Sequence, residues 1–259
     1  MNARVMLAFA AMAICFMHAV RADDNSLPPL NHLLIESVKQ MPLGGGYSAS
    51  AGANRALTLA VGTQDAKLSV NASHATPSYC SGATYLVFLK TLSALQSRGQ
   101  LNMTPETISS LKPAGQPDGT GIWGRWNANG PGTARLFYEL GLGPNFTDLG
   151  KALPGDFLKI FWNDGIGSTE HGHSVIFLGY DPKTDSVTFW SSNIPGGYGE
   201  KTVSCRKIHR MLFSRLEHPG NINRPLTPRT DNYLSSLERR PSSVSEMARQ
   251  CGLETELRR

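Results

Sequence analysis

Hydrophobic positions in the first half of the chain recur at helical spacing. Apolar residues every three or four positions predict helices near residues 29–41, 81–96, 104–112 and 132–140. The third of these begins with Thr104 and Pro105, a cap residue followed by proline at the first helical position. Residues 43–64 are rich in Gly, Ala and Ser, and they fit either a loop or a helix.

The second half of the chain changes to short apolar runs that favour strands. DFLKIFW, SVIFLGY and SVTFWSS are separated by turns rich in Gly, Asp and Pro, at residues 156–162, 174–180 and 186–192. Residues 67–73 fit a further short strand, and residues 210–216 fit a strand or a short helix. Helices followed by a strand meander predict an α+β fold with an antiparallel sheet.

The N-terminus reads as a secretory signal peptide. Arg4 supplies a positive start, an apolar run follows at residues 5–20, and small Ala22 precedes Asp23. An uncleaved membrane anchor is the alternative, but 16 apolar residues fall short of the roughly 20 that a span requires. We expect residues 1–22 to be removed, leaving a periplasmic or secreted monomer with no stable membrane insertion. Residues 23–218 would form its domain, and residues 219–259 an extended arm ending in a helix.

The net charge narrows the range of expected partners, and the cysteine content narrows the possible disulfides. Loss of Arg4 and Arg21 leaves 23 Lys and Arg against 20 Asp and Glu, a net charge of about +3 that does not favour nucleic acid. Cleavage also removes Cys15 and leaves three of the four cysteines. Export favours disulfides, and an odd number of cysteines leaves at least one thiol free. We expect Cys205 to pair with Cys251, which leaves Cys80 as the free thiol.

Cys80 is the candidate nucleophile. It precedes an apolar helix, where the helix dipole and free backbone N–H groups stabilise a thiolate, although a buried structural cysteine is the alternative. His173, at the start of an apolar strand, is the candidate base, and His171 fits a residue at the rim of the site. Ser191 and Asn193, near the end of the next strand, are both candidates for orienting the imidazole.

The segment WGRWNANGPG is the candidate wall of a substrate groove. Trp123 and Trp126 would pack on sugar or peptide, and Arg125 would pair with a carboxylate. The alternative is a loop held in place by buried tryptophans. We expect no cofactor and no metal, because the cysteines lack the paired C-x-x-C spacing of zinc sites.

Four motifs, taken in order, resemble the NlpC-type and CHAP-type papain-like cysteine peptidases. They are CSGATYLVFL, LPGDFLKIFW, GHSVIFLGYD and VTFWSSN, and the similar region covers about residues 75–216. The resemblance implies a papain-like fold in which an antiparallel sheet packs against a helix that carries the nucleophile. It also implies hydrolysis of amide bonds in the peptide stems of peptidoglycan.

Carried over residue by residue, the resemblance makes Cys80 the nucleophile, His173 the base, and Asn193 the favoured third residue over Ser191. Tyr79 stands where many NlpC-type members carry Asp, so we expect it, with Ser81, to influence substrate choice. The expected partner is peptidoglycan or a peptide, and an inhibitor or immunity protein stays open. Two other functions stay open as well: a non-catalytic wall-binding module and a Cys-dependent acyl or peptidyl transferase.

Overall fold

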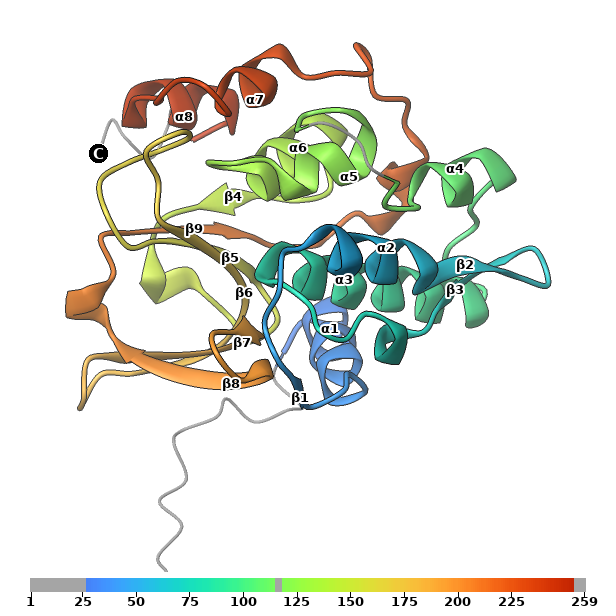
Figure 1. Ribbon diagram of the computed structural model, residues 1–259, viewed down its shortest axis with the longest axis horizontal. Coiled ribbons are helices and arrows are strands. Elements are labelled where there is room, and N and C mark those ends of the chain that lie inside the picture. Colours follow the sequence, from blue (N-terminus) through green and yellow to red (C-terminus); the bar gives the residue numbers. More distant parts are fainter. Residues whose placement is uncertain (1–26, 115–117, 254–259) are drawn as a thin grey trace, which may run out of the picture.

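A seven-stranded antiparallel sheet organises the computed structural model, which describes residues 27–114 and 118–253 (Figure 1). The strand order is β1-β8-β7-β6-β5-β9-β4, and β2 and β3 form a separate hairpin. The strands are β1 Gly44–Gly45, β2 Val61–Gln64, β3 Lys67–Val70, β4 Asn145–Phe146, β5 Phe157–Phe161, β6 Gly172–Asp181, β7 Ser186–Asn193, β8 Gly197–Ser204 and β9 Arg210–Ser214.

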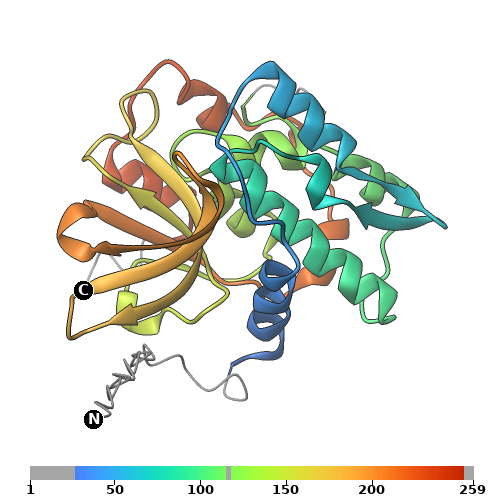
Figure 2. The same cartoon turned by 60° about the horizontal axis from the view of Figure 1, so that its bottom comes forward.

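Helices lie mainly to one side of this curved sheet (Figure 2). They are α1 Pro29–Lys39, α2 Ala51–Leu59, α3 Cys80–Ser97, α4 Pro105–Ser110, α5 Gly121–Asn127, α6 Gly132–Leu140, α7 Asn232–Ser236 and α8 Val244–Gln250. Short 3-10 helices lie at η2 Ala72–His74, η3 Leu149–Lys151, η4 Cys205–Lys207 and η5 Pro219–Asn223. The predicted α+β class with an antiparallel sheet is confirmed.

Most of the predicted elements are present. The ambiguous residues 43–64 contain β1, α2 and the start of the β2–β3 hairpin, and residues 210–214 form the strand β9, one of the two alternatives predicted there. Strand β8 was not predicted, because its sequence GYGEKTVS has few apolar residues and many exposed positions. The segment expected to be a loop around Trp123 is instead the helix α5, despite its Gly and Asn content.

Helix α3 lies at the centre of the fold. It contacts α1, α5, β6 and β7, and twelve of its eighteen residues are buried, including Tyr85, Phe88 and Leu92. The other face of the sheet has a separate core that contains Val175, Phe177 and six further apolar residues: Phe146, Leu158, Ile160, Val187, Phe189 and Phe213. The sheet is therefore apolar on both faces, and its strand ends are held between two cores.

The described part of the predicted C-terminal arm packs on the body instead of extending from it. Leu234 and Leu237 share an apolar cluster with Ala128, and Met247 shares another with Phe161 and Leu212. Helix α8 confirms the expected terminal helix. In Figure 1, α7 and α8 lie beside α5 and α6.

The predicted Cys205–Cys251 disulfide is wrong. Both thiols are free: Cys251 is buried in the cluster with Met247, whereas Cys205 packs at the edge of the second core. Because the two residues belong to different clusters, an odd cysteine count was not enough to pair them. The predicted signal peptide lies outside the described residues. Within residues 27–114 and 118–253, no helix is both long and apolar enough to cross a membrane.

The Pro154-Gly155-Asp156 turn joins α1 to the sheet. The Asp156 carboxylate is fully buried and accepts hydrogen bonds from Asn31 Nδ2 at 2.9 Å and from the Leu153 N–H at 2.8 Å. It also forms a two-point ion pair with Arg215, at 2.8 Å from Nε and 2.7 Å from Nη2. Asp156 therefore connects α1, the entry to β5 and the end of β9.

We predict that Asp156→Ala lowers the free energy of unfolding by about 3 to 5 kcal/mol, because it leaves Arg215 and Asn31 without their buried partner. Urea denaturation measures this change. Asp164→Ala, at an exposed position, is the control and is expected to change stability by about 0.5 kcal/mol or less. Equal stability of the two variants would contradict the role given to Asp156.

Candidate active site

Cys80 is the first residue of α3, where the backbone leaves an extended segment. Hydrogen bonds from the sheet hold this segment: the Tyr198 hydroxyl donates to Ala75 O at 2.8 Å, and Ser192 Oγ donates to Ser78 O at 2.9 Å. Tyr79, the N-cap residue, has extended dihedral angles and its side chain does not cap the N–H groups of the first turn. Cys80 is partly exposed as a residue, while its thiol is enclosed closely enough for burial to raise its pKa.

A glycine run brings Tyr47 to the same place. Gly45 has φ +84°, and a Cβ atom there would lie 2.2 Å from Thr76 Cγ2, so only glycine lets the two segments approach. Beyond the run, Tyr47 forms a β-bridge with Ser78, two residues before Cys80. The Tyr47 hydroxyl donates to the Cys80 sulfur and accepts a hydrogen bond from the Cys80 backbone N–H.

His173 and Asn193 lie on neighbouring strands and form a hydrogen bond. His173 Nε2 is 3.1 Å from Asn193 Oδ1. The Asn193 amide group is oriented by its own bonds, since Nδ2 donates to Gly199 O at 2.8 Å and to Ser191 O at 3.2 Å. Its Oδ1 must therefore face the histidine, which places a proton on Nε2 and leaves Nδ1 to interact with Cys80.

The Cys80 thiol is activated by its surroundings. Burial raises its pKa, but a hydrogen bond and the charge of His173 outweigh burial, and the Ser174 N–H and the Lys159 charge act in the same direction, so the pKa falls to about 7. The other described thiols behave in the opposite way. Burial raises the pKa of Cys251 to about 12, and burial together with Asp185 raises that of Cys205 to about 11. At neutral pH, Cys80 is the described cysteine with a large thiolate fraction.

Two aromatic rings fix the plane of the His173 imidazole. Trp162 stacks on it with a centroid distance of 6.3 Å, and Phe189 meets it at 5.7 Å and 72°. Alternation along β6 places His173 on the same face as Val175 and Phe177, as expected from the sequence. The histidine is thus held by packing and by Asn193, which is the arrangement that a general base requires.

The structure separates the two candidates for the third residue. Asn193 contacts the imidazole, whereas Ser191 is fully buried and donates to Ser174 O at 2.7 Å. Ser81 lies beside the nucleophile and donates to Asn127 Oδ1 at 2.6 Å. His171 is exposed and lies two residues before His173, and its backbone N–H donates to Asn163 Oδ1. Tyr79 is buried, and its hydroxyl donates to Asn54 Oδ1 at 2.6 Å, so its polar end faces away from a substrate.

The predicted groove wall corresponds to the second alternative, a segment held in place by buried tryptophans. Trp123 and Trp126 pack in an aromatic cluster with Tyr85 and are 4% and 1% exposed. Arg125 is fully buried: it pairs with Glu139 at 2.7 Å and donates to backbone carbonyls of residues 119, 228 and 229. These three side chains cannot reach a substrate, so they do not belong to the candidate site.

Sequence reasoning missed Tyr47, Lys159 and Glu170. A single aromatic residue after three glycines was the available signal for Tyr47, and a lysine inside an apolar strand was the signal for Lys159. The bridge of Tyr47 to Ser78 and the buried ion pair of Lys159 with Glu170 depend on the fold. In the described part of the chain, no group of three His, Cys, Asp or Glu residues is placed to hold a metal ion.

None of the protein-family models, curated proteins or solved structures compared with the chain matches it.

We predict that alkylation of Cys80 by iodoacetamide rises with pH through a midpoint near 7, because the thiolate forms above its lowered pKa. His173→Ala is expected to move the midpoint upward by at least about one unit, since burial then dominates. Mass spectrometry of the labelled peptide measures the profile.

His209→Ala, which removes an exposed histidine at the start of β9, is the matched control and should leave the midpoint unchanged. A wild-type midpoint in the ordinary range of cysteine, near 8.5, would contradict an activated thiol.

Proposed function

We propose that this protein is an exported cysteine hydrolase that cleaves amide bonds in peptidoglycan stem peptides. The observation that carries the proposal is the contact of Cys80, at the start of a buried helix, with His173, which Asn193 orients from the next strand. A helix with a nucleophile at its N-terminus, packed on an antiparallel sheet that carries the base and its orienting amide, also supports a papain-like fold.

The reaction follows from this geometry. The Cys80 thiolate attacks the carbonyl carbon of the amide, and the C=O electron pair moves to the oxygen. The resulting oxyanion is within reach of the Cys80 N–H and the Tyr47 hydroxyl, which meet beside the sulfur. Burial, followed by the negative charge of Cys80, raises the pKa of Tyr47, so the hydroxyl stays protonated and able to donate.

His173 completes both half-reactions. Its Nδ1 proton passes to the leaving amine as the C–N bond breaks, which leaves a thioester on Cys80. The neutral imidazole then removes a proton from water, and the hydroxide attacks the thioester carbonyl. The acid product leaves, and the sulfur returns as thiolate beside the imidazolium. Asn193 holds the ring in one orientation throughout.

The peptidoglycan substrate is supported by the resemblance of the four ordered motifs and by the signal-like N-terminus. A non-catalytic wall-binding module has less support, because the tryptophans that would line its groove are buried. An acyl transferase would use the same thioester, with an amine in place of water. Product analysis distinguishes it from a hydrolase.

We predict that the wild-type protein releases new fragments from peptidoglycan and that Cys80→Ala releases none. Mass spectrometry of the fragments identifies the bond, since hydrolysis adds one water per cleaved amide and transfer joins two fragments instead. Identical profiles for the two proteins would refute the wall hydrolase. Casein, incubated in parallel, tests for a general peptidase. Cleavage of casein without new peptidoglycan fragments would support the cysteine hydrolase mechanism but would refute peptidoglycan as the substrate.

We predict that Tyr47→Phe lowers kcat by about 100-fold or more, with a smaller change in KM, because one oxyanion donor is lost. Tyr180→Phe is the matched control: its hydroxyl, exposed on β6, donates to Asp185 at 3.1 Å. Steady-state rates on the fragment substrate identified above give both parameters. An unchanged kcat would exclude Tyr47 from the oxyanion site.

A further inference from the structure

A buried ion pair lies behind the nucleophile. Lys159 Nζ is 2.7 Å from Glu170 Oε1, and the two side chains are 14% and 7% exposed. Removing both charges from water costs more than their attraction commonly returns, so such a pair is weak evidence for a stabilising role. The position of this ion pair indicates a role other than stabilisation of the fold.

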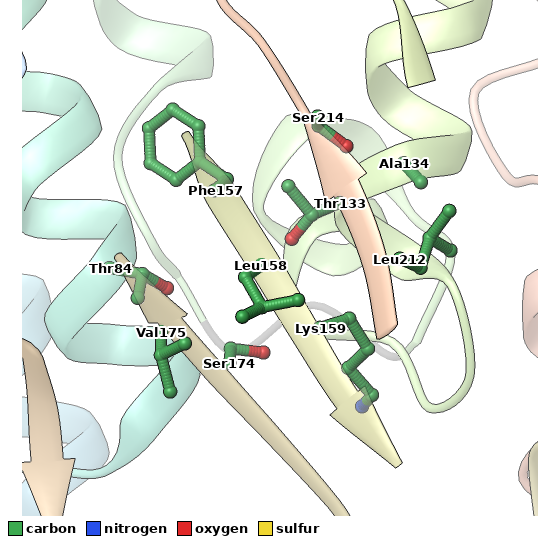
Figure 3. Close-up of a pocket in the computed structure, with 10 residues that line it drawn as sticks. All are labelled: Thr84, Thr133, Ala134, Phe157, Leu158, Lys159, Ser174, Val175, Leu212 and Ser214. Atoms are coloured by element: carbon green, nitrogen blue, oxygen red, sulfur yellow. The ribbon is translucent and has the colours of Figure 1, made fainter. Parts of the chain in front are cut away.

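The pair borders the backbone on both sides of His173. Lys159 is the register partner of Ser174, and a Cβ atom on Gly172 would lie 2.6 Å from Lys159 Nζ and 2.8 Å from Glu170 Oε1. Glycine at residue 172 is thus what lets the ion pair approach the strand. Figure 3 shows Lys159 and Ser174 on neighbouring strands, lining a pocket with Thr84, one helical turn beyond Cys80. The pocket has a volume of about 10 Å³, room for about one water molecule.

Glu170 also ties two loops together. Its Oε2 accepts hydrogen bonds from the Gly130 N–H and, at 3.0 Å, from the Gly167 N–H. The Gly130 loop continues from Asn127, which is bonded to Ser81 next to the nucleophile. The Gly167 loop leads into His173. One carboxylate therefore fixes the backbone that approaches the reacting pair from each side.

The titratable groups that interact with the thiol come from four segments. His173 lies on β6, Tyr47 follows β1, Tyr79 precedes α3, and Lys159 lies on β5. The Lys159 charge lowers the pKa of the thiol, after the larger contribution of His173. Asp118 in turn faces Lys159 and Glu170, and its pKa is raised to about 6 by burial and by the nearby Glu238.

We propose that Lys159 and Glu170 are positioning residues for catalysis. Lys159 supplies a second positive charge beside the Cys80 thiolate. Glu170 partly neutralises that charge and holds the two loops around the reacting pair. The inference rests on the proposed cysteine chemistry and adds residues that no motif assigned. A Lys–Glu pair with a purely structural role would have no preferred direction of effect on the thiol.

The pH profile of Cys80 alkylation by iodoacetamide, measured on the full protein, tests the pair by the sign of two shifts. Lys159→Met removes a positive charge, so the midpoint should rise by about half to one pH unit. Glu170→Gln leaves the ammonium without its counter-charge, so the midpoint should fall. Lys159→Arg keeps the charge and should restore a midpoint near the wild-type value. Lys183→Met, at an exposed turn, is the control and should show no shift.

Opposite shifts support the proposal, and shifts in the same direction, or none, overturn it. If Lys159→Met does not fold, as judged by circular dichroism, Glu170→Gln decides alone: a lower midpoint supports the role, and an equal or higher one removes it. A wild-type midpoint near 8.5 would refute the proposed function itself. A low wild-type midpoint that neither variant moves would refute this inference and leave the cysteine chemistry intact.

Discussion

The site depends on one packing constraint, which is the burial of α3 between the sheet strands β6 and β7, the hairpin strand β3 and the helices α1 and α5. A helix that is buried on most of its surface has its position set by what surrounds it. Its N-terminus lies where β6 and β7 carry His173 and Asn193. The same core contacts that stabilise the protein therefore bring the thiol to the imidazole, and no loop closure is needed to assemble the pair.

Backbone groups do much of the positioning around this contact. Ser78 is held by Ser192 and by its bridge to Tyr47, and the Ser174 N–H reaches the sulfur directly. Such contacts cost little side-chain entropy when the sheet is already formed. They also explain why Ser191 and Ser192 are buried: each serves a carbonyl beside the site while Asn193 alone meets the histidine.

The sequence allowed Cys80, His173 and the end of the following strand to be singled out, because each carries a local signal, whereas the choice between Ser191 and Asn193 required the fold. Cys80 opens an apolar run, His173 begins a strand, and Asn193 ends the next one. Tyr47 has no such signal, since its approach depends on a bridge between segments distant in the chain. The groove predicted from the tryptophans of α5 is absent for a different reason. Two aromatic residues beside an arginine give the same sequence pattern whether they lie in a groove or in a core. The packing of α5 on α3 and α6 decides between the two.

The buried charges of Arg125 and Lys159 show how much of a residue's role can be inferred from the sequence pattern alone. Arg125 and Lys159 are both basic residues within apolar segments, and both are paired with a glutamate. The remaining donors of Arg125 bond the backbone carbonyls of residues 119, 228 and 229. Arg125 therefore joins the C-terminal segment to the body of the protein. Lys159 has one carboxylate in direct contact, that of Glu170, with Asp118 farther away, and its charge lowers the pKa of the Cys80 thiol. An ammonium with one carboxylate in contact keeps part of its field, and that field acts on a nearby group that can become an anion. The number and placement of the partners thus distinguish Arg125, which joins segments of the fold, from Lys159, for which we propose a positioning role.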